Sequence, residues 1–115
     1  MSQVKQEASE LYKETVLLID ETKNKYTEII NFINGDKKLK LDPDVETHLI
    51  KLTEMWENVS YTNMDHFYSM KDHHCYITNC LKNKTLSDMW RGYLRYSSEF
   101  RCNLMRLNEL CSRLN

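Results

Sequence analysis

Glycine and proline are scarce in this sequence, with two glycines and one proline in 115 residues. Because these residues are the strongest breakers of helices, their scarcity predicts long helices. Long apolar runs are lacking too: none approaches the roughly 20 residues that span a bilayer. The first ten residues lack the basic and apolar parts of a secretory signal. We therefore expect a soluble protein without membrane insertion, located in the cytoplasm or the nucleus.

An excess of charge of one sign is also lacking. The formal net charge is -1, so no overall field would attract nucleic acid, and we predict no nucleic-acid partner. The sequence contains no glycine-rich phosphate loop. Helix pairing brings one nucleophile near a base, Cys102 beside His66, and a tightly packed bundle offers no pocket there. We therefore predict no enzyme activity, no catalytic residue and no cofactor.

Cysteine is present in a modest number, with four residues in the chain. Cellular reducing systems keep thiols free, so in a cytoplasmic or nuclear protein we interpret them as small buried apolar residues. An even count also permits disulfides if the chain is secreted, which leaves a cytokine-like helical ligand as an alternative. The four residues are Cys75, Cys80, Cys102 and Cys111.

The sequence divides into three helical stretches within a single domain, residues 1–115. In the first stretch, apolar residues are spaced by three and four, and Asn34 and Gly35 follow as a pair typical of a helix C-terminus. Asp42 and Pro43 are typical of a helix N-terminus and begin the second stretch. The expected helices span about 3–34, 43–82 and 86–114.

Apolar residues in the second and third stretches alternate in steps of four and three, a heptad pattern that predicts coiled-coil-like packing. Ser60, Tyr61 and Thr62 are mediocre helix formers, so a break near residue 62 would divide the second helix. The buried positions expected in the second helix are Val45, Leu49, Leu52, Trp56, Val59, Asn63, His66, Met70, His73, Ile77 and Cys80. Those expected in the third helix are Leu86, Trp90, Tyr93, Ser97, Phe100, Leu104, Leu107, Cys111 and Leu114.

Short links between the stretches make consecutive helices antiparallel. The sequence therefore predicts an all-α fold: an antiparallel bundle of three long helices, or of four with the break, which oligomerisation could complete. If the chain folds back at residues 83–85, the facing pairs include Phe100 with Phe67, Trp90 with Ile77 and Cys111 with Trp56. An unbroken second helix would be about 60 Å long and would extend past the first helix.

The tip where the second and third helices meet has no cover from the first helix in this arrangement. Its apolar residues would form an exposed patch of the kind that marks an interaction surface. If the middle helix breaks, the tip instead folds inward and becomes core. The candidate interaction residues are Ile77, Leu81, Leu86, Met89, Trp90 and Tyr93.

The stretch DHFYSMKDHHCYITNC, residues 65–80, holds three histidines and two cysteines. Metal ligands on one helix must be three or four residues apart to share a face, and only Asp72 and Cys75 meet that spacing. We therefore predict no metal site, and a metal-binding alternative would need ligands from other helices. Polar residues at heptad positions instead fix register and partner choice. The residues to which we assign this role are Asn63, His66 and His73.

Long antiparallel helices without a catalytic motif favour a non-enzymatic interaction or scaffold module that self-associates or docks partner helices. In general shape the arrangement resembles the three-helix bundles of spectrin repeats and of the syntaxin N-terminal region. It is similar, again in shape alone, to small helical subunits of cytoskeletal, chromosomal and vesicle-tethering assemblies. We expect protein partners and a homo-oligomer. The cytokine-like ligand and a metal-binding helical protein are the alternatives.

Overall fold

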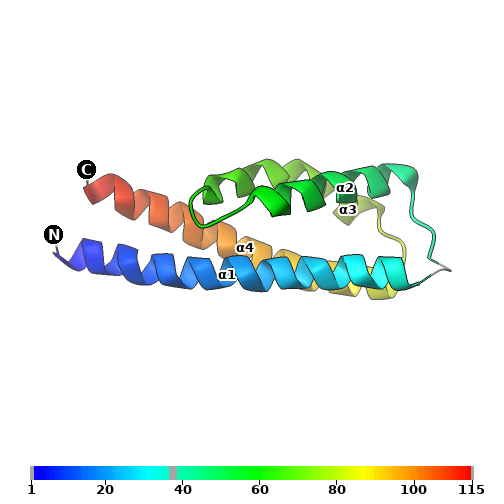
Figure 1. Cartoon of the computed structure of the whole chain (residues 1–115), viewed down its shortest axis with the longest axis horizontal. Coiled ribbons are helices and arrows are strands. Elements are labelled where there is room, and N and C mark those ends of the chain that lie inside the picture. The colour runs from blue at the N-terminus through cyan, green and yellow to red at the C-terminus, as the bar shows by residue number, and fades with distance from the viewer. Residues whose placement is uncertain (1, 37–38, 115) are drawn as a thin grey trace.

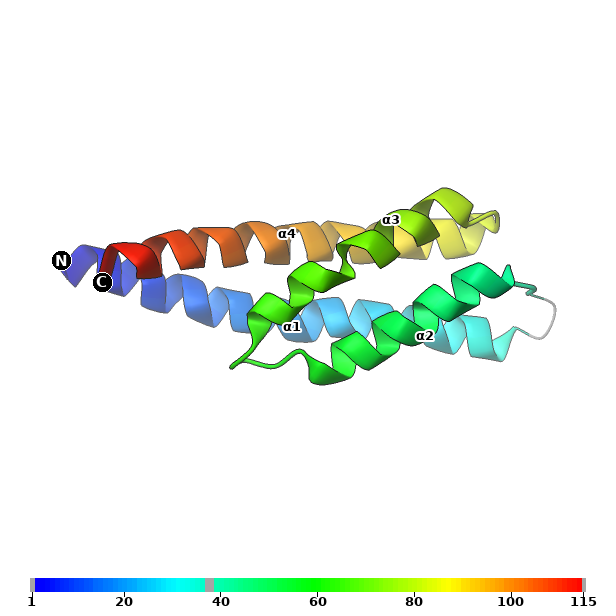
Figure 2. The same ribbon diagram turned by 90° about the horizontal axis from the view of Figure 1, so that it is seen from above.

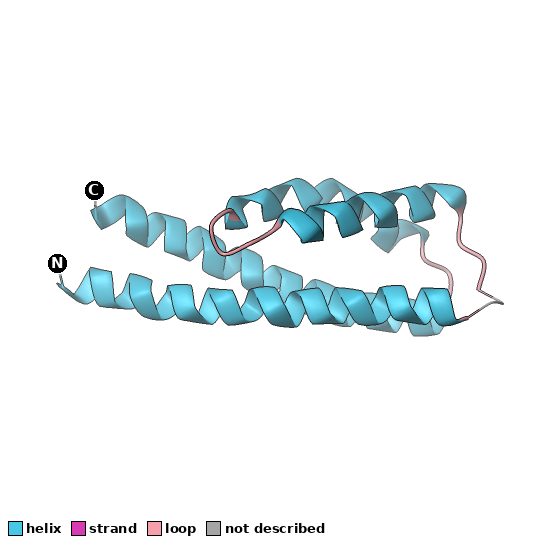
Figure 3. Cartoon of the chain, in the orientation of Figure 1, coloured by secondary structure: helices cyan, strands magenta, loops and turns pink. Residues whose placement is uncertain are grey.

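The computed structural model describes residues 2–36 and 39–114, and within these residues the chain is all-helical, as the sequence predicts. Figure 3 shows helices joined by loops, with no strand in the described part of the chain. The elements in chain order are α1 (Ser2–Gly35), α2 (Pro43–Asn58), the 3-10 helix η1 (Met64–Met70), α3 (Lys71–Cys80) and α4 (Lys84–Leu114).

Two long helices, α1 and α4, form the backbone of the fold. They lie side by side along their whole length and run in opposite directions, so that both termini lie at the same end of the molecule (Figure 1). The shorter α2 and the η1–α3 segment form a hairpin that packs over the other end of this pair (Figure 2). The molecule is elongated, with extents of 57 × 21 × 19 Å.

The second predicted helix is interrupted at residues 59–63, so the prediction of one continuous rod is wrong and the predicted break near residue 62 is confirmed. Val59 ends α2 with an extended backbone conformation. Asn63 closes the turn, because its Oδ1 accepts hydrogen bonds from the Ser60 N–H (2.6 Å) and hydroxyl (2.8 Å). Its Nδ2 donates to the carbonyl of Asn58 (2.6 Å). The chain therefore reverses direction instead of continuing.

This reversal changes how the helices pair. With three helices, the first and last would run in the same direction, whereas the extra reversal makes α1 and α4 antiparallel. The rings of Tyr26 and Tyr93 lie 5.4 Å apart across this pair. Tyr26 also ties α1 to α2, because its hydroxyl donates to the Leu49 carbonyl (2.8 Å) and lies 2.9 Å from Thr53 Oγ1. Burial raises the pKa of Tyr26 to about 12.

The predicted pairing of residues 64–82 with α4 is close to the observed one. The rings of Phe67 and Phe100 are 4.6 Å apart, and Trp90 Nε1 donates to Thr78 Oγ1 (2.9 Å), one residue from the predicted partner. The pairing of Cys111 with Trp56 is wrong, because the break redirects α2. The Trp56 indole donates instead to the Tyr93 hydroxyl (3.0 Å).

The heptad pattern of the last helix holds as far as Leu107. Beyond it the buried residue is Leu110, while Cys111 and Leu114 are exposed, so the prediction that the last two heptad positions are buried is wrong. Leu107 and Leu110 are three residues apart, where the heptad pattern requires a step of four at this position.

Candidate functional site

The residues predicted to form an exposed interaction tip belong mostly to the core of the single chain. Ile77, Leu86, Trp90 and Tyr93 are each at most 2% exposed, and Leu81 and Met89 are half-buried. The predicted lack of cover does not arise, because the break at residues 59–63 folds α3 back beside α2 and over α4. The alternative, in which the tip folds inward, describes the structure.

None of the three polar residues predicted at buried heptad positions is fully buried. Asn63 and His66 are exposed, and Asn63 caps the turn described above. His73 is half-buried, with its Nδ1 2.7 Å from Nδ1 of His48 on α2. Burial and the neighbouring His48 lower the pKa of His73. Met64, Phe67 and His74 are buried in place of their predicted neighbours, while Met70 and Ile77 are buried as predicted.

A cluster of Trp56, Tyr93 and His74 occupies the middle of the core. His74 is 4% exposed, and its Nε2 lies 2.5 Å from the Tyr93 hydroxyl oxygen. The indole ring of Trp90 meets the His74 ring edge-on at 5.8 Å. The sequence reasoning missed this histidine because the heptad pattern selected its neighbour, His73. The predicted pairing of α3 with α4 already placed residue 74 within one residue of Tyr93.

Hydrogen-bond chemistry favours one tautomer of neutral His74. The Trp56 indole can only donate, so the Tyr93 oxygen accepts from it. With the His74 proton on Nδ1, the Tyr93 hydroxyl donates to Nε2, whereas the other tautomer would leave that hydroxyl hydrogen without an acceptor. We therefore assign the proton to Nδ1, a buried atom with no hydrogen-bond partner. Burial, with smaller effects of Arg101 and His73, lowers the pKa of His74 to about 3. The ring is therefore neutral near pH 7, with one buried N–H donor unsatisfied.

A groove of about 260 Å³ lies between α3 and α4 beside this histidine. Among the residues that the structure describes, its lining contains two cations, Lys71 and Arg101, and no acidic residue. Arg101 lies 5.9 Å above the Phe67 ring. The full lining consists of Lys71, His74, Cys75, Thr78, Asn79, Leu94, Ser97, Ser98 and Arg101.

The end of the molecule that holds both termini has only two helices. We call residues 3–14 of α1 and 104–114 of α4 the two-helix extension. The hairpin touches its inner part, where Tyr12 donates to the Tyr61 carbonyl and Asn108 donates to Asp65 (3.5 Å). The ends of the two long helices lie beyond the hairpin (Figures 1 and 2). Of the seven exposed large apolar side chains among the described residues, five lie on the extension or next to it. They are Tyr12, Leu17, Tyr61, Met105 and Leu114.

A groove of about 410 Å³ marks the boundary between the hairpin and the two-helix extension. Tyr12 and Tyr61 meet there, with the Tyr12 hydroxyl donating to the Tyr61 carbonyl (3.3 Å). Ala8, Leu107 and Cys111 line its extension side. This notch lies where another helix would continue the two-layer bundle past the turn of the hairpin. We call it the boundary groove.

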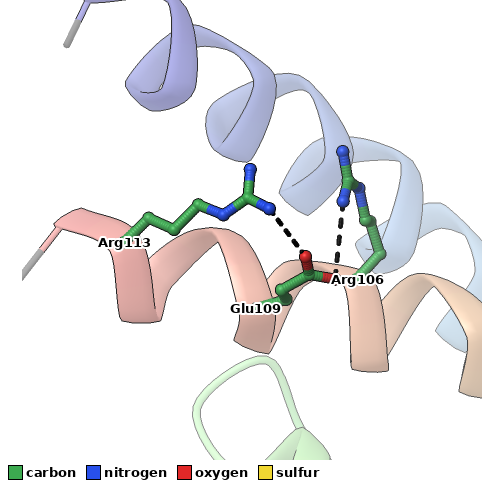
Figure 4. A network of polar contacts seen from close by, with 3 residues as sticks. All are labelled: Arg106, Glu109 and Arg113. Carbon is green, nitrogen blue, oxygen red and sulfur yellow. Dashed lines mark hydrogen bonds and ion pairs between the residues drawn. The ribbon is translucent and has the colours of Figure 1, made fainter.

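Charged residues on α4 of the extension are paired along the helix. Glu109 accepts from Arg113 (2.9 Å) and lies 3.4 Å from Arg106 (Figure 4). The three side chains are about half exposed. Exposed ion pairs three or four residues apart on a helix contribute less than about 1 kcal/mol to stability. Two arginines share one glutamate, so this part of α4 keeps a net positive charge.

The four cysteines all lie in the described part of the chain. All four cysteines are free; Cys80 is half-buried and the other three are exposed, so the prediction of buried cysteines is wrong for those three. Within residues 2–36 and 39–114, no three His, Cys, Asp or Glu side chains gather to hold a metal ion. Over the same residues, no helix combines the length and apolarity needed to cross a membrane.

The chain matches no protein-family model, no curated protein and no solved structure. Inference about its function therefore rests on the geometry described above.

Proposed function

We propose that this protein is a non-enzymatic helical interaction module that self-associates through the two-helix extension. The observation that carries the proposal is the difference in length between the α1–α4 pair and the hairpin that covers it. α1 has 34 residues and α2 has 16, which correspond to about 51 Å and about 24 Å of helix. The outer part of the pair, on the two-helix extension, therefore lacks the second layer with which helices bury their apolar sides.

A second copy of this chain fits the extension better than other partners do. It brings an identical pair of antiparallel helices, and two such pairs facing each other complete a four-helix bundle. Association about a two-fold axis uses the same surface on both copies, so no separate binding patch is required. Tyr12 is 41% exposed at the boundary groove and would be covered by the partner.

The charges of the extension support the same pairing. Residues 3–14 contain two lysines and three glutamates, and residues 104–114 contain two arginines and one glutamate. An arrangement that places α1 of one copy against α4 of the other therefore brings opposite net charges together. Charge of this kind favours one orientation of the two copies and adds little to their affinity.

Two matched substitutions of exposed cysteines on α4 test the proposal. Cys111 lines the boundary groove, whereas Cys102 lines a different groove, beside Leu17 and Leu18. Arginine at either position suits an exposed helical site. Cys111→Arg should weaken the dimer by about tenfold or more in sedimentation equilibrium, while Cys102→Arg should not.

Circular dichroism provides the folding control for both variants, since neither substitution touches the core. Equal affinities for the wild type, Cys111→Arg and Cys102→Arg would refute the boundary groove as the interface. Weakening by Cys102→Arg alone would place the interface on the other face of the α1–α4 pair and would refute the proposal as well.

A further inference from the structure

The groove between α3 and α4 differs from the rest of the surface in the chemistry of its lining. Every charged side chain that lines it is cationic, namely Lys71 and Arg101. Neither cation forms a salt bridge with an acidic residue in the described part of the chain. Two positive charges facing one small hollow repel each other unless an anion lies between them. The groove is thus electrostatically suited to an anion.

A second and independent observation comes from His74, one of the residues that line the groove. It lies between Lys71 one turn before it and Thr78 one turn after it on α3. The Tyr93 hydroxyl occupies His74 Nε2, which leaves the buried Nδ1–H as a donor without an acceptor. A buried donor without a partner is costly in a folded protein and calls for an acceptor.

The hydroxyl groups that line the groove differ in whether they already form hydrogen bonds within the protein. The Thr78 hydroxyl already donates to the His74 carbonyl (2.7 Å) and accepts from the Trp90 indole (2.9 Å), so it is fully engaged. Ser97 and Ser98 complete the wall on the α4 side. The groove therefore offers cationic donors, hydroxyl donors and one imidazole N–H, while it lacks any acidic group.

We propose that this groove binds a small oxyanion of the phosphate class. Arg101 and Lys71 neutralise its charge, and the Nδ1–H of His74 donates to one of its oxygens when the side chains above it move apart. Hydrogen bonds between charged donors and phosphate oxygens are among the strongest that side chains form. A volume of about 260 Å³ is large enough for a phosphate group. This site is separate from the two-helix extension and does not depend on self-association.

The test is a titration of the full chain with inorganic phosphate, followed by ¹⁵N NMR of the histidine rings at constant ionic strength. We expect a saturable shift of the His74 Nδ1 resonance with a dissociation constant of about 1 mM. Sulfate should compete, and chloride should not. O-Phosphoserine distinguishes the source of the phosphate: tighter binding than inorganic phosphate indicates an esterified group, and weaker binding indicates the free ion. Both results support the site.

Variants identify the residues responsible. Arg101→Gln and Lys71→Gln should each weaken phosphate binding by about tenfold. Arg95→Gln, which removes an exposed arginine of α4 outside the groove, should leave it unchanged. Thermal unfolding shows whether Arg101→Gln has lost the fold along with its contact to Phe67, and Lys71→Gln has no such contact. Absence of a saturable shift up to about 50 mM phosphate, or equal binding by Lys71→Gln and the wild type, would overturn the proposal.

Discussion

Replacing His74 by glutamine should remove most of the sensitivity of this protein to mild acid. In the folded chain burial lowers the pKa of His74 to about 3, whereas an unfolded histidine titrates at about 6.5. Between these values the unfolded chain binds a proton that the folded chain does not. The free energy of unfolding therefore falls as the pH drops below about 6.5.

The size of the effect follows from the pKa difference. Each pH unit between the two pKa values costs about 1.4 kcal/mol of stability, so the loss at about pH 5 is roughly 2 kcal/mol. This is a large share of the 5–15 kcal/mol by which domains are typically stable. Glutamine at position 74 does not titrate, and its side-chain oxygen can still accept from the Tyr93 hydroxyl.

Urea denaturation followed by circular dichroism at about pH 7.5 and about pH 5 measures the loss for each variant. His74→Gln should lose about 2 kcal/mol less than the wild type on acidification. His66→Gln is the matched control, because His66 is exposed on η1 and should keep the wild-type response. His73, whose pKa is also lowered, contributes equally to all three chains. The same acid loss in His74→Gln as in the wild type would refute a neutral buried His74.

Three substitutions in α4, each measured by urea denaturation, test the core from other directions. Trp90→Ala should cost about 3–5 kcal/mol of stability, because Trp90 is 2% exposed. A near-neutral result would indicate that Trp90 is exposed on the surface and not buried in the core. Tyr93→Phe should cost about 1–3 kcal/mol, since it leaves the Trp56 indole without its acceptor; no loss would contradict that hydrogen bond. Gly92→Ala should stabilise by about 0.5–1 kcal/mol, because nothing lies within 4 Å of the added methyl group. Destabilisation by this last change would show close packing at that position.

Much of the fold could be predicted from the sequence because local signals and tertiary packing agree there. Asp42 caps α2 as expected, with its side chain accepting from the Asp44 N–H (2.8 Å). The apolar spacing places Leu52 and Trp56 in the core as predicted. In these stretches periodicity and burial follow the same face of a helix.

The turn at residues 59–63 could be predicted only in part. Poor helix formers indicate an interruption of the helix there, but they do not tell whether the chain then bends or reverses. The reversal depends on the hydrogen bonds of Asn63 to Asn58 and Ser60. Once the chain reverses, the two helices that flank the turn become neighbours, and the expected tip becomes core.

The sequence indicated the wrong histidine for a local reason. The heptad pattern selects His73, three residues after Met70, whereas the structure buries His74, four residues after Met70. Both histidines lie near the helical face that Met70 and Ile77 share, so periodicity alone does not choose between them. Likewise, the uncovered surface was expected at the α3–α4 link and the structure has it at the opposite end, because a hairpin covers the former and ends short of the latter.

Molar mass in solution, measured by light scattering across a range of concentrations, tests self-association most directly. The chain has a mass of 13.9 kDa, and two copies joined through their extensions should give about twice this value at high concentration. The mass should fall to that of one chain on dilution. A mass of one chain at every concentration would contradict the account.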